Sequence, residues 1–173
     1  MDFRKVDSPG IHLVNGPKTD LPLAVEANVA GKAAASLLKA LGEPFGVEIT
    51  VTKSIKPGSG IGSSAASAVA AVVGVDALAE TGMRHDELLP FALDGEAVAS
   101  GARHADNVAP ALMGGMTLID PDGNVCALPV PSSWRLVVLH PQVVIKTAES
   151  RAVLPDTVAL TDADYGTVSQ AED

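Results

Sequence analysis

Apolar residues follow helical spacing in some stretches of the chain and strict alternation in others. Over residues 28–41 they recur on one face of a helix, which Asn28 can cap and which Gly42 and Pro44 prevent from continuing. The next segment, 47–52, alternates β-branched and polar side chains, which predicts a strand with one buried face. Both kinds of element are therefore expected within the first third of the chain.

Two more helices are predicted after a loop over 53–62. The first, from Ser63 to about Ala79, is rich in alanine and valine on nearly every side, which predicts a buried helix that Gly82 ends. The second runs over 86–100 and carries Pro90 in its first turn or so, where proline is tolerated.

The remaining patterned segments are short. A helix leads into two strands joined by a Pro-Asp-Gly turn, which predicts a hairpin. The segments before residue 24 and after residue 160 are expected to be largely irregular. The short elements expected are a strand at 11–14, a helix at 106–113, strands at 116–119, 125–130 and 135–139, and a helix at 147–154. Their order predicts the α+β class, with antiparallel pairing in the second half.

The charge balance excludes one broad class of partner. The 173-residue chain has 12 lysines and arginines against 21 acidic residues, a net charge of −9, so we expect no nucleic-acid partner. Aromatic residues make up only 3%, which leaves little material for stacking on bases. A local anion site built from backbone N–H groups remains compatible with this acidic surface.

Cysteine content and hydropathy indicate a cytoplasmic protein without a membrane partner. Cys126 is the sole cysteine, which excludes an intramolecular disulfide and a cysteine-based metal cage and suits a reducing compartment. The longest apolar run, 65–75, is shorter than the roughly 20 residues that cross a bilayer. The first ten residues lack the apolar core of a signal peptide.

The strongest chemical signal is the run Pro-Gly-Ser-Gly-Ile-Gly-Ser-Ser-Ala-Ala-Ser at 57–67. A strand, a glycine loop and then a helix direct free backbone N–H groups at an anion, and Ser63 or Ser64 can cap the helix, bind phosphate or ligate Mg²⁺. No lysine follows Gly62, so the run is not a P-loop, and the serine at 63 excludes the dinucleotide fingerprint. The residues alone leave two alternatives, a phosphate site and a flexible loop with a serine cap.

The same run resembles the phosphate-binding motif of the GHMP small-molecule kinases, which include galactokinase, homoserine kinase, mevalonate kinase and phosphomevalonate kinase. The matching residues are Pro57, Gly60, Gly62, Ser63, Ser64, Ala65 and Ala66, with Ile61 in place of leucine. The resemblance implies that the loop wraps the phosphates of ATP. The nucleotide-binding residues it implies in this run are Pro57, Gly58, Ser59, Gly60, Ile61, Gly62, Ser63, Ser64 and Ala65.

Three further segments resemble the homoserine kinases of that family. They are Gly-Glu-Ala-Val-Ala-Ser-Gly at 95–101, His-Ala-Asp-Asn-Val-Ala-Pro-Ala-Leu-Met-Gly-Gly at 104–115, and Lys-Thr-Ala-Glu-Ser-Arg-Ala-Val-Leu-Pro at 146–155. The resemblance implies ATP-dependent phosphorylation of the hydroxyl of L-homoserine, a small-molecule substrate of threonine biosynthesis. A GHMP kinase acting on another alcohol is the alternative within the same class.

The resemblance also implies a metal site and a nucleotide contact. Ser64 (or Ser63) and Glu96 would hold Mg²⁺, which prefers hard oxygen ligands; taken alone, Glu96 is expected to be an ordinary solvated helix residue. Asn28 fits either a place beside the adenine or a plain helix cap, and one amide cannot easily serve both.

The implied amino-acid site draws on two segments. Asp106 would pair with the substrate ammonium and Arg151 with its carboxylate, while Asn107 and His104 would bond its polar ends. Thr147 either contacts the substrate or caps its helix, and the cap is slightly favoured. Without the resemblance, His104 is a loop histidine and Asp106 a helix cap. The residues expected to carry the transfer are Glu96, Ser64, Asn107 and Arg151, with no evident general base.

The implied fold is a two-layer GHMP-kinase-like sandwich. We expect an incomplete nucleotide-binding domain over 1–130 and the start of a second domain over 131–173, because the family's first strand pair and last glycine loop have no counterpart here. The chain would then be a fragment, half of a split enzyme, or a non-catalytic remnant that binds a nucleotide or a partner. An open sheet edge would call for a homodimer or a complementing chain.

Overall fold

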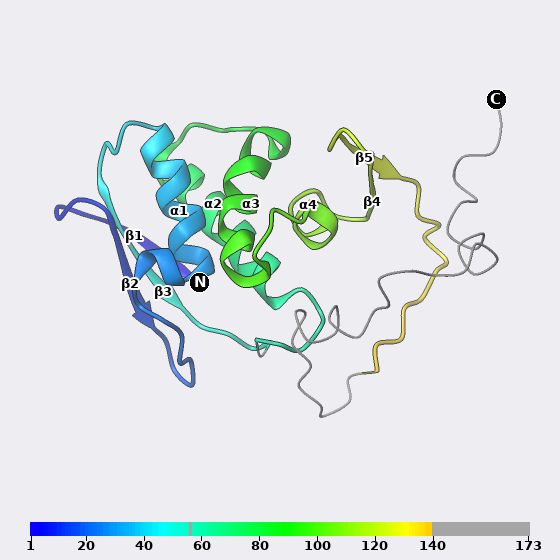
Figure 1. Cartoon of the computed structure of the whole chain (residues 1–173), viewed down its shortest axis with the longest axis horizontal. Coiled ribbons are helices and arrows are strands. Elements are labelled where there is room, and N and C mark those ends of the chain that lie inside the picture. The colour runs from blue at the N-terminus through cyan, green and yellow to red at the C-terminus, as the bar shows by residue number, and fades with distance from the viewer. Residues whose placement is uncertain (56, 140–173) are drawn as a thin grey trace.

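The computed structural model describes residues 1–55 and 57–139 (Figure 1). Ten elements follow one another along this part of the chain. In order they are β1 (Asp2–Val6), β2 (Ile11–Asn15), the 3-10 turn η1 (Val25–Ala27), α1 (Val29–Ala40), β3 (Gly46–Val51), α2 (Ser63–Ala79), α3 (His85–Ser100), α4 (Ala105–Met113), β4 (Met116–Ile119) and β5 (Val125–Leu128).

A three-stranded sheet forms the first layer. β3 lies in the middle, antiparallel to β1 and parallel to β2. Along β3, Val47, Ile49 and Val51 are almost completely buried, whereas Glu48 between them faces the opposite side and pairs with Arg4 at 2.7 Å. The alternation predicted for this strand is therefore confirmed, and only one face of the sheet carries the core.

The helices form the second layer: α1 and α2 lie against the apolar face of the sheet, and α3 and α4 pack on them farther from it (Figure 1). α2 packs against both α1 and α3, which explains why it is apolar on nearly every side. Small residues allow this close packing: a Cβ at Gly95 of α3 would lie 2.6 Å from the carbonyl oxygen of Val29 and 2.7 Å from Cβ of Ala33. The predicted α+β class and two-layer arrangement are thus confirmed.

The β4–β5 pair extends from the helical layer on the side away from the sheet (Figure 1). The strands are antiparallel, and the turn is closed by Asp120, whose Oδ1 accepts the backbone N–H of Asn124 at 2.8 Å. The predicted hairpin is therefore confirmed, although β5 ends at Leu128 rather than at residue 130.

Two sequence predictions are wrong. Residues 135–139 form no strand, because no other segment within the described part of the chain pairs with them, and a strand needs such a partner for its N–H and C=O groups. The start of the chain, expected to be irregular up to residue 10, contains β1, which pairs with β3. The helix predicted at 147–154 lies outside the described residues.

Candidate functional site

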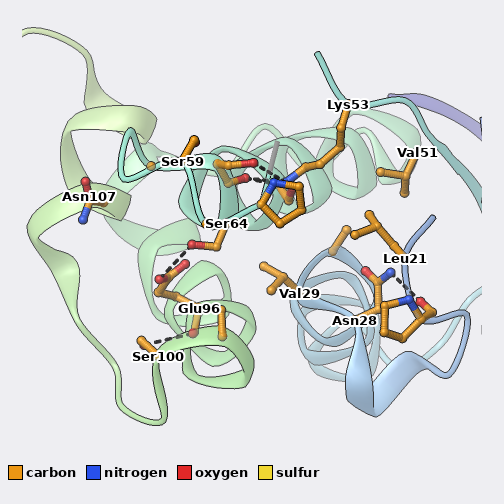
Figure 2. Close-up of a pocket in the computed structure, with 18 of the residues that line it drawn as sticks. Leu21, Asn28, Val29, Val51, Lys53, Ser59, Ser64, Glu96, Ser100 and Asn107 are labelled. Atoms are coloured by element: carbon orange, nitrogen blue, oxygen red, sulfur yellow. Dashed lines mark hydrogen bonds between the residues drawn. The ribbon is translucent and has the colours of Figure 1, made fainter. Parts of the chain in front are cut away.

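A cavity of about 450 Å³ opens where the glycine loop meets the ends of four helices. Its wall combines the end of β3, the loop, the starts of α1, α2 and α4, and the end of α3 (Figure 2). The segments that the sequence singled out separately therefore contribute to one hollow, although Ile61 and Ala65 of the predicted loop residues do not line it. The lining residues from these segments are Asn28, Pro57, Gly58, Ser59, Gly60, Gly62, Ser63, Ser64, Ser67, Glu96, His104, Asp106 and Asn107. This convergence makes the cavity the candidate site.

The loop owes its shape to glycines in the left-handed region of backbone conformation. Gly58, Gly60 and Gly62 have φ angles of 75°, 74° and 74°, which other residues adopt only with strain. Gly62 is the N-cap of α2 and supplies no side-chain acceptor to the first turn of that helix. The N–H groups at the start of α2 thus retain their capacity to bind an anion, as the glycine pattern predicts.

The two serines that follow the loop point to different partners. Oγ of Ser64 donates a hydrogen bond to Oε1 of Glu96 at 3.1 Å, across the cavity wall from α2 to α3 (Figure 2). Oγ of Ser63 instead donates to the carbonyl oxygen of Ile55 at 2.9 Å. Of the two serines left open by the sequence, Ser64 is the one that lies beside Glu96.

Glu96 is buried, with only 7% of its surface exposed, so the expectation of a solvated helix residue is wrong. Close packing of Gly95 against α1 holds this part of α3 in the interior. Burial raises the pKa of Glu96, the hydrogen bond from Ser64 opposes that rise, and the nearby charge of Asp106 adds to it. A carboxylate in this environment is stabilised by a cation that enters the cavity.

One oxygen of this carboxylate remains without a partner. Oε2 of Glu96 is buried and forms no hydrogen bond with any described residue. Buried polar atoms are nearly always paired, so an unpaired one on a residue that lines a cavity is compatible with a ligand bound there. Within residues 1–55 and 57–139, no group of three or more histidine, cysteine, aspartate or glutamate residues could hold a metal. The oxygens of Ser64 and Glu96 nonetheless fit Mg²⁺, because this ion takes one or two carboxylates and completes its coordination with waters and phosphate oxygens.

Asn28 acts as the N-cap of α1. Its Oδ1 accepts the backbone N–H of Gly31 at 3.1 Å, and its Nδ2 donates to the carbonyl oxygen of Pro22 at 2.7 Å. Both ends of the amide are thus engaged, which favours the capping alternative that the sequence left open. Asn28 also lines the cavity, and its contact with an adenine stays a prediction.

The start of α4 brings three of the predicted substrate residues to the cavity. His104 is the N-cap residue of α4, and Oδ1 of Asp106 accepts the backbone N–H of Asn107 at 3.1 Å. All three line the same wall as Glu96. The predicted pair Thr147 and Arg151 lies outside the described residues.

The opposite end of the cavity is apolar. Leu21, Val29 and Val51 lie there beside Asn28, away from the loop and the carboxylates (Figure 2). The hollow thus has a polar end with N–H groups, hydroxyls and carboxylates, and an apolar end that suits a flat, weakly polar group.

Lys53 is the site residue that the sequence missed. Its ammonium donates to the carbonyl oxygen of Ser63 at 2.6 Å and to Oγ of Ser63 at 2.8 Å, and the side chain lines the cavity. Burial lowers the pKa of Lys53, and the charge of Glu96 opposes that change. A lysine placed directly between a strand and a glycine loop was the available signal.

Comparison with known families identifies this arrangement. Residues 28–115 match the family model described as GHMP kinases N terminal domain. The chain belongs to the GHMP kinase family. The match spans α1 to the end of α4 and includes the loop, Ser64 and Glu96, so the resemblance inferred from the glycine motif is confirmed.

Relatives within the GHMP kinase family are named homoserine kinases. One from Xanthomonas campestris pv. campestris (strain B100) is 42% identical over 161 residues, covering 92% of this chain and 50% of that protein. One from Natronomonas pharaonis is 44% identical over 140 residues, covering 81% of this chain and 45% of that protein. The chain thus spans about half the length of the curated relatives it matches.

A solved GHMP kinase structure is also similar. The crystal structure of homoserine kinase from Cytophaga hutchinsonii superposes with a TM-score of 0.84 at 37% identity, over 96% of this chain and 55% of that one. The predicted GHMP fold is therefore confirmed. None of the helices in the described part of the chain is long and apolar enough to cross a bilayer.

Proposed function

We propose that this chain carries the nucleotide site, and part of the acceptor site, of an enzyme that transfers the γ-phosphoryl group of ATP to the hydroxyl of L-homoserine. The observation that carries the proposal is the unpaired, buried carboxylate oxygen of Glu96 opposite the glycine loop. Relatives named homoserine kinase, at 37–44% identity, support the choice of acceptor.

ATP would lie along the length of the cavity. Its phosphates would meet the backbone N–H groups of the loop and of the first turn of α2, where the helix dipole favours negative charge. Its base would occupy the apolar end, near Val29 and Val51. The residues assigned to the nucleotide are those predicted from the sequence, 57–65 together with Asn28.

Ser64 and Glu96 would hold Mg²⁺ through their oxygens. When bound, the ion would offset the negative charge that develops on the phosphates as the bond breaks. Glu96 contributes a buried carboxylate whose negative charge is destabilised until a cation arrives, and Ser64 orients that carboxylate through its hydrogen bond. Loss of either group is expected to weaken metal-dependent nucleotide binding.

The acceptor would bind at the start of α4. Asp106 is exposed to the cavity and can pair with the substrate ammonium, and Asn107 and His104 can bond its polar ends. Arg151 would bind the substrate carboxylate, and Thr147 would either contact the substrate or cap its predicted helix. Positioning of the hydroxyl by these groups suffices for phosphoryl transfer, so no general base is assigned.

The proposal includes the organisation expected from the sequence. The nucleotide-binding part would extend to residue 130 and a second part would begin at 131. The enzyme would act in the cytoplasm, as the single cysteine favours. A homodimer or a complementing chain would supply strands that border the sheet.

Two measurements on the purified chain test the proposal. Calorimetry with ATP and Mg²⁺ measures nucleotide binding, and a phosphorylation assay offers homoserine, mevalonate, galactose and shikimate as acceptors. We expect ATP binding that requires Mg²⁺, and transfer to homoserine alone. Phosphorylation of another acceptor but not homoserine would overturn the substrate. Binding of ATP without transfer to any acceptor would instead favour a non-catalytic nucleotide-binding module.

A further inference from the structure

We propose that Lys53 is a positioning residue that clasps the two ends of the glycine loop together before any ligand arrives. Lys53 lies at the start of the loop, two residues after β3, and Ser63 follows the loop as the first residue of α2. The ammonium of Lys53 donates to both the carbonyl oxygen and Oγ of Ser63, at 2.6 and 2.8 Å (Figure 2). The identity of the anion in the loop rests on the proposed function, but the clasp itself does not.

A second set of bonds fixes each partner of the clasp. Oγ of Ser63 donates to the carbonyl oxygen of Ile55, which lies at the start of the loop. The backbone N–H of Lys53 donates to Oγ1 of Thr19 at 3.2 Å, which ties the base of the loop to the segment after β2. One set of hydrogen bonds therefore joins the two ends of the loop. Joining the ends restricts the conformations that the glycines between them can adopt before a ligand binds.

The position of the Lys53 charge is electrostatically unfavourable for the fold without a ligand. Lys53 forms no ion pair with any described residue, and its charge lies at the start of α2, where the helix dipole disfavours a cation. Such an arrangement raises the positive potential at the mouth of the loop. An anion bound there would offset this unfavourable electrostatic free energy, so ligand binding explains the lysine better than stability does.

Removing the ammonium should leave a folded chain. Without Lys53, the carbonyl oxygen of Ser63 keeps the hydrogen bond from Oγ of Ser67 at 3.1 Å. Oγ of Ser63 keeps its bond to Ile55. No buried polar atom of Ser63 is orphaned by the change, so Lys53→Met separates positioning from folding.

The experiment compares Lys53→Met, Lys53→Arg, Ser63→Ala and the double variant Lys53→Met/Ser63→Ala with a matched control, Lys39→Met. Lys39 is an exposed lysine of α1, away from the cavity. Hydrogen exchange of the amides at 58–62 is measured without ligand, Mg-ATP affinity by calorimetry, and the unfolding midpoint by thermal melting.

For Lys53→Met we expect at least about tenfold faster exchange in the loop, an unchanged or higher midpoint, and about 10–100-fold weaker binding of Mg-ATP, the range measured for outer-shell positioning groups. Lys53→Arg should restore part of the affinity, and Ser63→Ala should have a smaller effect. The double variant should lose less than the sum of the two single losses, because both changes remove the bond between Lys53 and Oγ of Ser63. Lys39→Met should change none of the three.

Unchanged loop exchange in Lys53→Met would overturn the clasp, and so would additive losses in the double variant. Failure of the wild-type chain to bind Mg-ATP would count against the proposed function, while the ligand-free exchange would still decide the clasp. The two outcomes are therefore distinguishable.

Discussion

The helical layer and the segment after the hairpin contain the same apolar side chains but surround them differently. Leu37 and Leu38 of α1 are 0% and 2% exposed, whereas Leu136 and Leu139 are 90% and 87% exposed. The helix that carries the first two leucines packs against α2, α3 and the sheet, whereas the segment that carries the second two belongs to no described helix or strand. Burial is therefore a property of the elements that meet at a position and not of the residue type.

The candidate site draws on the helical layer. The loop and Glu96 are held by the packed helices, and the start of α4 adds the proposed acceptor residues at the opposite end of that helix from the hairpin. Changes where the packed helices border the cavity should therefore affect stability and binding together, and changes at the exposed side chains of 135–139 should leave stability almost unchanged.

Leu37→Ala should have the largest effect on stability. The side chain is fully buried in α1, so its truncation leaves a cavity that the neighbouring helices cannot close, at a cost of roughly 2–5 kcal/mol. Urea unfolding measures the loss. A cost below about 1 kcal/mol would contradict the close packing of the helical layer.

Glu96→Gln should have the largest effect on the site. Replacing the carboxylate removes the charge that would hold Mg²⁺ and should reduce metal-dependent phosphorylation by about 100-fold or more, roughly 3 kcal/mol. Steady-state kinetics with Mg-ATP checks this, and near-normal activity would exclude Glu96 from the site.

The same variant should also change how stability depends on pH. Because burial raises the pKa of Glu96, the folded chain keeps this proton to higher pH than the unfolded chain. The group therefore stabilises the fold below its unfolded pKa, and this contribution is lost as pH rises through its folded pKa. Glu96→Gln should remove that decline, and equal pH profiles for the two proteins would argue against the raised pKa.

Gly95→Ala should have a smaller, mixed effect. A methyl group at this position meets the backbone of α1, so α3 must shift at a cost of about 1–3 kcal/mol, partly offset by alanine's better helix propensity of about 1 kcal/mol. Because the shift moves Glu96, affinity for Mg-ATP should fall as well.

Gly74→Ala serves as the matched control for that variant. A Cβ there would lie 2.5 Å from the ring of Phe3, at the contact between α2 and β1 and away from the cavity. It should lower the free energy of unfolding without changing the affinity for Mg-ATP. An equal loss of affinity in both variants would show that the contact of Gly95 with α1 has no particular role in positioning Glu96.

Leu136→Ser should have the smallest effect. The side chain is 90% exposed, so the free energy of unfolding should change by less than about 0.5 kcal/mol. Chemical unfolding of the same chain tests this, and a loss above about 1 kcal/mol would reveal that the leucine is buried in solution.

The helices could be predicted because their signals are local. Asn28 and Gly42 mark the ends of α1, and the glycine loop marks the start of α2, within a few residues of the positions they define. β1 was missed because its partner, β3, lies far along the chain and its own sequence is largely charged. The strand predicted over 135–139 is wrong for a related reason, because the sequence of a segment does not show whether another strand pairs with it.

The site could be predicted in part. The glycine motif gave the loop, and the family resemblance gave Ser64 and Glu96, which the fold brings within 3.1 Å of each other. The burial of Glu96 follows from the packing of Gly95 on α1, and the clasp follows from the return of the chain at Ser63. Both depend on contacts between residues that are separated along the chain, so neither could be predicted from local sequence patterns.

The position of α2 has a mechanical consequence. Its buried face runs from Ser63 through Ala68 to Val75, between two other helices and above the sheet, so displacing it would disturb the whole core. The start of this helix therefore holds a fixed position in the cavity wall. A ligand at that end of the cavity would meet a preformed surface.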